Sequence, residues 1–440
     1  MSFFQKNMLI ACPRFIRAAT LLAAVLMTLC TPCAQAASFD SCVAGLRQTA
    51  LAQGIRASTF DQSMQGVEPD EDVLKFYGYQ PEFRTAIWDY VSGLVDEERV
   101  ADGRQLMTQW SSVLDQAEQK FGVDRNVIVA VWGVESNFGR IQGKRELVRS
   151  LTTLVCANKR QAFFRDELIA TLRIIQAGDI APESLVGSWA GAFGQTQFMP
   201  TTYQRLAIDF DGDGRRDIVS SVPDALGSTA NYLHRAGWVT GEPWGYEVQL
   251  PANYTGPSGR RTKQSLDRWA SLGIRPVEAA QSGTPAGARH VSPANNQAAL
   301  ILPAGVNGPA FLVFRNFDAI YSYNAAESYA LSIAHLADRL RGGAGFRTPW
   351  PTDDPGTSRA ERRELQQRLL DRGYEIGLAD GLVGDKTRQA ISAFQLSVGM
   401  TADGRAGQQV LKVLRAGSSA SGSSASGTNT LSSNVQASEK

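Results

Sequence analysis

The chain has 440 residues, which is enough for two or three domains with substantial cores. Its 44 Lys and Arg residues nearly balance its 43 Asp and Glu residues, for a formal net charge of +1. Composition therefore gives no general attraction to nucleic acid or to anionic lipid, and we expect no nucleic-acid partner.

The first 36 residues have the pattern of a cleaved signal peptide. A basic start is followed by the apolar stretch AATLLAAVLMTLC (18–30) and by the small residues Ala34 and Ala36, which suit a cleavage site. The apolar stretch is short for a bilayer span of roughly 20 residues. This length favours cleavage over the alternative, a retained membrane anchor.

The cysteines fit an oxidising compartment. Neither Cys30 nor Cys33 lies in a good lipobox, because Leu29 and Pro32 stand where a small residue is expected. Beyond that site, Cys42 and Cys156 are candidates for one disulfide. The alternative is two unrelated buried thiols. We expect secretion without a lipid anchor.

Residues from about 40 to 240 have mainly helical patterns, with apolar residues at three- and four-residue spacing through 89–122. A following helix starts after the expected N-cap Asp124 and stops between Asn137 and Gly139.

Glu135 falls in the last turn of this helix, inside the apolar run VIVAVWGVESNFGR (127–140). Burial and the negative end of the helix dipole both favour the protonated form of a carboxyl there. A protonated carboxyl can act as a general acid. The alternative is a helix-terminal glutamate paired with a base such as Arg140.

The stretch GSWAGAFGQTQFMPTTY (187–203) combines Gly and small residues with amides, hydroxyls and aromatic rings. That composition suits a groove in which the backbone closely approaches a polar ligand.

Between 241 and about 315 the pattern changes to short runs separated by Pro, Gly and Asn. The runs at 246–251, 298–304 and 309–317 predict strands of a small inserted β subdomain. Helix is expected again at 324–341.

Residues 342–358 have the composition of a linker, and 359–415 of a separate helical unit. A D-G-x-x-G turn precedes a helix twice in this unit, at Asp380 and at Asp403, which indicates an internal repeat. The Ser/Gly-rich stretch 416–440 is expected to be a disordered tail.

The acidic loop IDFDGDGRRDIVSSVPD (208–224) satisfies the first half of an EF-hand pattern, but Ser220 stands where the bidentate Glu is expected. The alternative is a solvated Asp/Gly turn. The predicted oxygen ligands are Asp209, Asp211, Asp213, the carbonyl of Arg215, and Asp217 directly or through water.

The three histidines, His234, His290 and His335, have no metal-ligand spacing and no nucleophile motif beside them. A P-loop and a Rossmann fingerprint are also missing from the sequence. A Ser-His-Asp hydrolase, a zinc amidase and a nucleotide-dependent enzyme are disfavoured accordingly.

Four stretches resemble the lytic murein transglycosylase B family, enzymes that cut the glycan strands of bacterial peptidoglycan. They are residues 80–91 (QPEFRTAIWDYV), 127–140, 187–203 and 316–340, and they follow the family's order. The resemblance implies a mainly α (α+β) fold. A lysozyme-like helical catalytic domain would occupy residues 37–341 and contain the small β insertion.

Residues 359–415 resemble the peptidoglycan-binding domain of type 1, a small three-helix module found in many wall enzymes. The alternative is a generic helical bundle with Asp-Gly turns.

The resemblance also implies a mechanism with one carboxyl. Glu135 would protonate the β-1,4 bond between N-acetylmuramic acid and N-acetylglucosamine, and the muramic C6 hydroxyl would then attack while Glu135 recovers its proton. The product is a 1,6-anhydro sugar, and no water is consumed. The alternatives are a lysozyme-type hydrolase, in which Glu135 activates water, and a non-catalytic wall-binding protein.

By the same resemblance, amides, hydroxyls and aromatic rings line the glycan groove. The residues at the matching positions are Ser188, Gln197, Phe198, Tyr232, Tyr323, Asn324 and Tyr329, with Arg160 facing a lactyl or peptide carboxylate. Core packing is the alternative for each aromatic side chain.

The resemblance further points to Asp224 as the closing carboxylate of the acidic loop, one residue later than expected. A Ca²⁺ ion there would be structural, and no cofactor is required for the chemistry. We expect a periplasmic monomer that binds peptidoglycan glycan strands, with cell-wall synthesis or division proteins as further partners.

Overall fold

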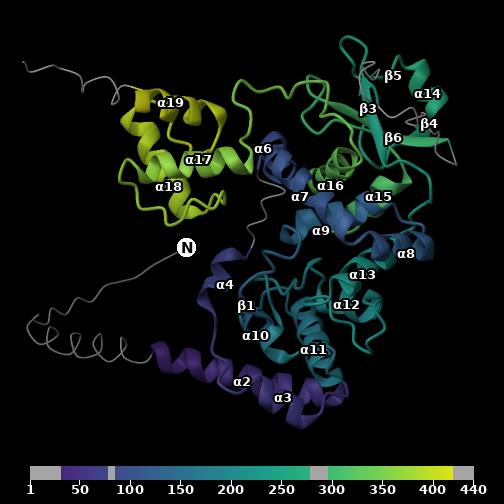
Figure 1. Cartoon of the computed structure of the whole chain (residues 1–440). Helices are drawn as coiled ribbons and strands as arrows, with labels where there is room; N and C mark the ends of the chain where they lie inside the picture. Colours follow the sequence, from purple (N-terminus) through teal and green to yellow (C-terminus); the bar gives the residue numbers. More distant parts are fainter. Residues whose placement is uncertain (1–30, 78–84, 278–295, 420–440) are drawn as a thin grey trace, which may run out of the picture. The chain divides into compact units, whose positions relative to one another are not determined.

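The computed structural model describes residues 31–77, 85–277 and 296–419 (Figure 1). Most of the predicted signal segment and of the predicted tail, and His290, lie outside these ranges. The chain forms two compact units. The first unit is Met1–Tyr77, Gly143–Phe193 and Phe198–Gln204, and the second is Gly78–Gln142, Gly194–Gln197 and Arg205–Lys440.

The first unit is mainly helical. Its elements are α2 (Thr31–Ala52), α3 (Ala57–Ser63), α4 (Glu71–Phe76), β1 (Arg145–Glu146), α10 (Leu147–Cys156), α11 (Gln161–Ala177), η1 (Pro182–Ser184), β2 (Val186–Gly187) and α12 (Pro200–Leu206). Helix α10 packs against α11, α2 and α4, and β1 pairs antiparallel with β2. Leu147, Leu151 and Leu154 of α10 are fully buried in this packing.

Cys42 in α2 and Cys156 at the end of α10 form the disulfide that the sequence suggested, with Cα atoms 5.7 Å apart. It joins two helices of the first unit that are 114 residues apart in the chain.

The second unit holds Glu135, the sheet and the C-terminal module. Its helices are α6 (Ile87–Leu94), α7 (Glu97–Gln109), α8 (Ser111–Phe121), α9 (Arg125–Ser136), α13 (Val222–Arg235), α14 (Leu266–Ser271), α15 (Arg315–Tyr321), α16 (Glu327–Leu340), α17 (Arg359–Leu370), α18 (Asp385–Ser397) and α19 (Gln408–Ser419). Helix α9 packs against α16, α7 and α13. This position buries nearly every side chain from Val127 to Trp132 in the largest core cluster.

The segment 89–122, which has one helical pattern in the sequence, is divided into α6, α7 and α8. The first break comes at Asp96, whose side chain accepts the N–H of Arg99 at 2.8 Å and so caps α7. Trp110 separates α7 from α8. The apolar spacing persists through both breaks, so periodicity alone did not reveal them.

The region predicted as a β insertion contains one antiparallel five-stranded sheet with the order β4-β6-β7-β3-β5. Its strands are β3 (Gly245–Gln249), β4 (Lys263–Ser265), β5 (Arg275–Pro276), β6 (Gln297–Ile301) and β7 (Ala310–Val313). The three predicted strands correspond to β3, β6 and β7, while the short edge strands β4 and β5 were not predicted. Trp269 of α14 is fully buried in the core of this sheet.

The C-terminal module, α17 to α19, has its own core, which includes Leu365, Ile391 and Leu411. Helix α19 continues to Ser419, so the tail predicted from residue 416 begins later. Both Asp-Gly turns are held in the same way. A buried glutamine of the preceding helix bonds each turn: Gln366 accepts the N–H of Gly381 at 2.6 Å, and Gln395 that of Gly404 at 2.9 Å.

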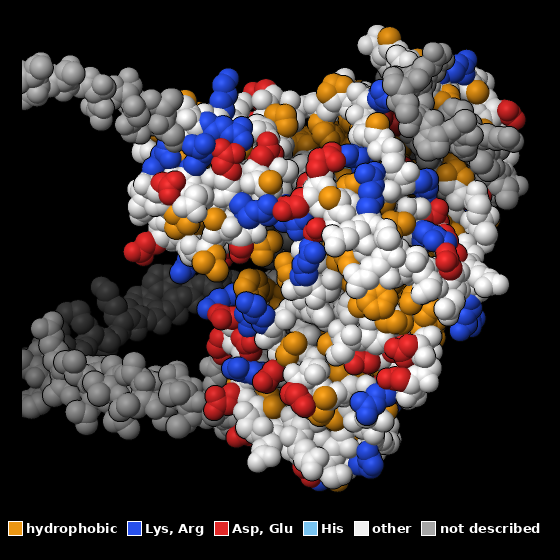
Figure 2. Space-filling model, in the orientation of Figure 1, with side chains coloured by type: hydrophobic (Ala, Val, Ile, Leu, Met, Phe, Trp, Pro, Cys, Tyr) orange, Lys and Arg blue, Asp and Glu red, His pale blue; other side chains and the backbone are white. Residues whose placement is uncertain are grey.

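Charged side chains of both signs are spread over one face of the molecule. Figure 2 shows Lys and Arg side chains mixed with Asp and Glu over the visible face. Among the described residues, every helix is too short or too polar to span a bilayer.

Candidate functional site

Glu135 lies in the last turn of α9, as predicted. Asp124 caps the start of this helix by accepting the N–H of Asn126 at 2.7 Å, and Asn137 ends it in the left-handed region with φ of 51°. Glu135 itself is half-buried. The predicted alternative, a pair with Arg140, is wrong, because the Arg140 guanidinium bonds Asp102 instead.

The chain reverses sharply after Glu135. Asn137, Phe138 and Gly139 all have positive φ, which folds the Phe138 ring back against α9 and edge-on to Trp132. Gly133 makes this packing fit, because a Cβ there would lie 2.7 Å from the Phe138 ring. Gly139 is required for a second reason, since a Cβ would meet the side chain of Gln195 at 2.6 Å.

A buried polar network holds this reversal in place. The Gln195 side chain, 4% exposed, accepts the indole N–H of Trp132 at 3.0 Å. Its backbone carbonyl accepts the hydroxyl of Ser136 at 2.5 Å, and that hydroxyl accepts the N–H of Gly139 at 2.7 Å. Two hydrogen bonds therefore fix Ser136, the residue directly after Glu135, and a third joins Trp132 to the same glutamine.

The Tyr329 hydroxyl of α16 donates a hydrogen bond to Glu135 Oε1. Burial, followed by the negative charge of Glu135, raises the pKa of Tyr329 well above its usual range, so the phenol stays protonated as the donor. A donor bonded to a carboxylate stabilises the charge left once a proton has departed. The Tyr329 hydroxyl is therefore suited to stabilise the carboxylate of Glu135 between the loss of a proton and its recovery.

Two more predicted tyrosines lie beside Tyr329. The Tyr323 ring stacks on that of Tyr329, with centroids 6.2 Å apart, and is 4.5 Å from that of Tyr232. The Tyr323 hydroxyl donates to the carbonyl of Thr196 at 2.7 Å. Burial raises the pKa of Tyr323 well above its usual range, and the charge of Glu135 adds to this effect. The Tyr323 ring is thus held in place by its own hydrogen bond and by contacts with the rings of Tyr329 and Tyr232.

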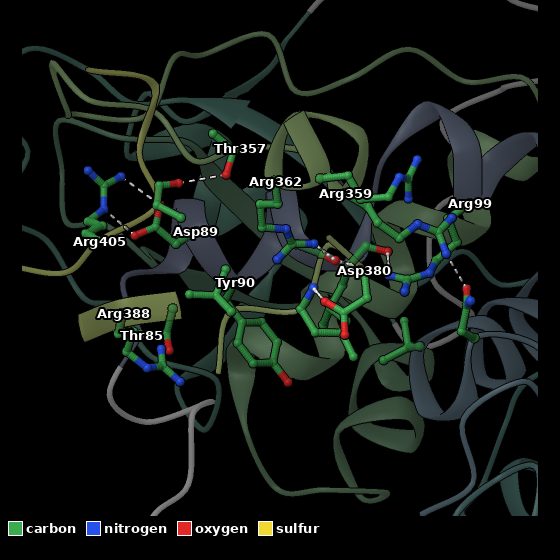
Figure 3. A pocket seen from close by; sticks show the side chains of 18 of the residues that line it. Thr85, Asp89, Tyr90, Arg99, Thr357, Arg359, Arg362, Asp380, Arg388 and Arg405 are labelled. Atoms are coloured by element: carbon green, nitrogen blue, oxygen red, sulfur yellow. Dashed lines mark hydrogen bonds and ion pairs between the residues drawn. The ribbon is translucent and has the colours of Figure 1, made fainter. Parts of the chain in front are cut away.

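Glu135 lines a cavity of about 1060 Å³, a volume at the upper end of typical small-ligand sites. Residues of α6, among them Asp89 and Tyr90, line it together with the end of α9. Arg99 of α7 and Ile141 also line it, and the C-terminal module contributes further residues, including Arg362 and Asp380 (Figure 3).

The acidic loop of the second unit brings three carboxylates together. One carboxylate oxygen from each of Asp209, Asp211 and Asp213 lies within 4.8 Å of the others. The loop turns around these oxygens, since Asp209 accepts the N–H groups of Gly212 and Gly214 at 2.7 and 2.8 Å. Converging carboxylates on a turn of this kind fit a hard divalent cation such as Ca²⁺.

The other predicted ligands of this loop bond its backbone. Asp224 is fully buried, and its two oxygens accept the N–H groups of Phe210 and Asp217, each at 2.7 Å. It is outside the group of three carboxylates, so the prediction of Asp224 as closing ligand is not met in this structure. Asp217 accepts two further N–H groups, and Arg215 donates its own N–H to Asp213 at 2.8 Å.

The family profile described as Transglycosylase SLT domain matches residues 38–338. The chain belongs to this family. The profile of the putative peptidoglycan binding domain matches residues 358–414. The two matches confirm the predicted resemblances of the catalytic region and of the C-terminal module.

Three relatives of this transglycosylase are informative. SltB3 from Pseudomonas aeruginosa, solved with NAG-NAM-pentapeptide, is 43% identical with a TM-score of 0.66, over 86% of this chain and 99% of that one. The Escherichia coli lytic transglycosylase Slt35, solved with calcium, is 28% identical with a TM-score of 0.59, over 68% of this chain and 92% of that one. Membrane-bound lytic murein transglycosylase B of Escherichia coli (strain K12) is 33% identical over 256 residues, 57% of this chain and 66% of that protein.

Within the first unit, the structure changes the interpretation of one predicted groove residue of the transglycosylase. Phe198 is 1% exposed, so its ring packs in the interior and is corrected from a groove residue to a core residue. The Ser188 hydroxyl accepts the N–H of Ala192 at 3.1 Å and is half-buried. Arg160 is exposed, with its guanidinium 4.3 Å from the centroid of the Phe163 ring.

In the second unit, Gln197 has a positive φ of 50° and donates its side-chain amide to the carbonyls of Gln142 and Gly194. Asn324 is exposed. Tyr329, 2% exposed, contacts Glu135 rather than an open surface.

Sequence reasoning missed Gln195, Ser136 and Trp132 as supports of the site. The signal was present, since two of them flank Glu135 and Gln195 lies in the Gly-rich stretch. Only their contact in the folded chain shows that they act together.

Proposed function

We propose that this lytic transglycosylase cleaves the β-1,4 bond between N-acetylmuramic acid and N-acetylglucosamine, with Glu135 as the single acid and base. The observation that carries the proposal is the hydrogen bond from Tyr329 to a half-buried Glu135 that faces a large cavity. Peptidoglycan fragments are the ligands of SltB3, the relative that covers most of this chain.

The reaction needs one proton donor and one internal nucleophile. Glu135 donates a proton to the glycosidic oxygen, and the bond to the muramic anomeric carbon breaks with the charge of an oxocarbenium ion. The 2-acetamido oxygen assists at that carbon. The muramic C6 hydroxyl then forms the new bond and returns a proton to Glu135. Donated and recovered protons balance, and water takes no part.

The protein's contribution is to hold the carboxyl through both proton transfers. The Ser136 and Gln195 bonds fix the end of α9, and the Tyr329 hydroxyl stabilises the carboxylate between the two transfers. A site held in this way needs little rearrangement as the charge appears and disappears.

Substrate contacts are proposed for the predicted groove residues that remain available. They are Ser188, Gln197, Tyr232, Tyr323, Asn324 and Arg160. Hydroxyls and amides bond sugar hydroxyls and N-acetyl groups, tyrosine rings pack on pyranose faces, and an arginine binds carboxylate.

A structural Ca²⁺ in the acidic loop is also proposed, held by Asp209, Asp211 and Asp213. Support comes from the convergence of these carboxylates and from the calcium complex of Slt35. The ion would neutralise their repulsion and stiffen the loop. The chemistry at Glu135 needs no cofactor.

The remaining features fit an enzyme exported to the cell wall. We propose that the first 36 residues are a cleaved signal and that the mature chain is a periplasmic monomer. The C-terminal module would bind peptidoglycan, and cell-wall synthesis or division proteins are proposed as further partners.

Mass spectrometry of digested peptidoglycan tests the reaction. Anhydro muropeptides, lighter by one water than the products of hydrolysis, are expected. A digest that contains reducing-end muropeptides alone would instead identify a lysozyme-type hydrolase. If the wild-type protein did not cleave peptidoglycan, the remaining interpretation would be a non-catalytic wall-binding protein.

A further inference from the structure

The cavity at Glu135 has an unusual second wall. One side is formed by α6 and the end of α9, and the other by the C-terminal module through α17 and both Asp-Gly turns. Contacts in the second unit join the two sides. Arg359, at the start of α17, donates to the side chain of Asn137 at 2.8 Å, two residues beyond Glu135.

The charges that line this cavity favour an anionic ligand. Six arginines line it, against four carboxylic acids. The arginines are Arg99, Arg359, Arg362, Arg363, Arg388 and Arg405, and the acids are Asp89, Glu135, Asp380 and Asp403. Even with every acid ionised, two positive charges remain on the lining. The chain as a whole has a formal net charge of +1, and Glu98 and Asp354, beside the lining, offset part of the local excess through ion pairs with Arg363 and Arg405.

Most of these arginines already have carboxylate partners. Arg363 bonds Glu98 at 2.8 Å, and Arg405 bonds Asp89 at 2.6 Å. Arg359 also bonds Glu98, at 3.1 Å. These contacts join the module to the catalytic helices, although Arg359 Nη2 is buried without a hydrogen-bond partner among the residues that the structure describes, as is Arg99 Nε.

Arg362, in contrast to Arg359, Arg363 and Arg405, has no ion pair with a carboxylate in the described part of the chain. It donates to the carbonyl of Gly93 at 3.1 Å, and its Nε is buried without a hydrogen-bond partner among the described residues. Burial lowers the pKa of Arg362, the charges of Arg359 and Arg363 add to this effect, and those of Asp96 and Asp89 oppose it without cancelling it. In the view of Figure 3, Arg362 lies between Asp89 and Arg359. A buried cation whose charge is poorly compensated gains from an added anion.

We propose that Arg362, with Arg388 on the same wall, binds a carboxylate of the peptide stem carried by the glycan strand at Glu135. This inference rests on the proposed function. Sugar units are largely uncharged, so the acidic groups of peptidoglycan lie on its lactyl-linked peptide. The planar guanidinium binds a carboxylate through two parallel hydrogen bonds. The module would thus select peptide-bearing strands, in addition to holding the wall.

The substitution Arg362→Gln tests this role in the full-length enzyme. The substrates are glycan strands with their stem peptides and the same strands after an amidase has removed the peptides. We expect KM for peptide-bearing strands to rise about tenfold, because a charge-assisted hydrogen bond is lost. The kcat on both substrates, and KM for denuded strands, should stay near wild type. Arg415→Gln is the matched control, since Arg415 is exposed in the same module and outside the cavity lining.

An equal change on both substrates would overturn the inference and assign Arg362 a structural role through Gly93. No change on either substrate would overturn it as well. If the variant folds poorly, Arg388→Gln decides, because Arg388 is exposed and its nearest carboxylate, Asp385, is 3.9 Å away. We expect about a threefold rise in KM confined to peptide-bearing strands. A wild-type enzyme that cleaves neither substrate would refute the proposed function instead.

Discussion

The end of α9 and the acidic loop both present carboxyl groups, but their surroundings differ. Glu135 is half-buried beside aromatic rings and is bonded by the Tyr329 hydroxyl. Asp209, Asp211 and Asp213 converge within 4.8 Å on a turn whose own N–H groups bond them. The first setting suits movement of one proton, and the second suits binding of one cation.

The contrast shows how one chemical group takes two roles. Glu135 is partly removed from water and accepts the Tyr329 hydroxyl, in a setting built of helices that pack around it. The three carboxylates of the acidic loop instead converge on a turn whose backbone N–H groups they accept, an arrangement whose mutual repulsion a metal ion would relieve. Position in the fold, rather than residue type, separates the two.

We expect the largest effect on activity from the substitution Glu135→Gln. It keeps the size of the side chain but removes the transferable proton, so we expect kcat on peptidoglycan to fall about a thousandfold. Turbidity of purified sacculi and the yield of anhydro muropeptides measure this loss. Glu146→Gln, which changes an exposed glutamate of β1, should act like wild type. Unchanged sacculus clearing by Glu135→Gln would mean that the glutamate is a bystander.

We expect the second-largest effect on activity from the substitution Tyr329→Phe. Removal of the hydroxyl takes away the hydrogen bond that Tyr329 donates to Glu135, and kcat should fall about tenfold with little change in KM. The control is Tyr254→Phe, which removes a hydroxyl bonded to the carbonyl of Pro257 in the sheet region. Equal kcat values for wild type and Tyr329→Phe would show that the hydrogen bond does not serve the reaction.

His335 in α16 allows a test that does not involve catalysis. It asks whether the protein interior around this helix disfavours a charged side chain. Burial, followed by the charge of Arg339, lowers the pKa of His335 to about 3. The unfolded chain therefore binds more protons below the ordinary histidine pKa of 6.5, and stability is lost as pH falls from there toward 3.

The loss for His335 should reach about 2 kcal/mol at about pH 5. Denaturant unfolding between pH 7 and 5 measures it. His335→Gln should lose less stability over this range than wild type, whereas His234→Gln, at an exposed position, should follow wild type. Parallel curves for all three proteins would contradict the burial argument.

The effect expected of the acidic loop depends on the calcium concentration. Calcium should raise the stability of the folded chain by about 2.7 kcal/mol at a concentration about a hundred times its Kd. Asp213→Asn should reduce this gain, since it removes one charge while keeping an oxygen that accepts the N–H of Arg215. Thermal unfolding with calcium and with a chelator measures both effects, and Asp371→Asn in the module is the control. A calcium-dependent shift of the same size in Asp213→Asn would exclude this residue as a ligand.

Much of the fold and of the site was readable from the sequence. The apolar run ending in Glu135, its Asp124 cap and its Asn137 stop gave the bounds of α9, because capping depends on neighbouring residues. The repeated Asp-Gly turns gave the module for the same local reason. The divisions at Asp96 and Trp110 were not readable, since the apolar pattern runs through them.

The sequence by itself determined which carboxyl ends an apolar helix, where the acidic turn lies and which region forms strands, all of which follow from spacing along the chain. Only the tertiary structure decided that Tyr329, 194 residues away, bonds Glu135, that Phe198 is buried and that Arg362 faces the same cavity. Side chains so distant in sequence meet through packing of whole helices, and that packing leaves no periodic signal in the residues themselves.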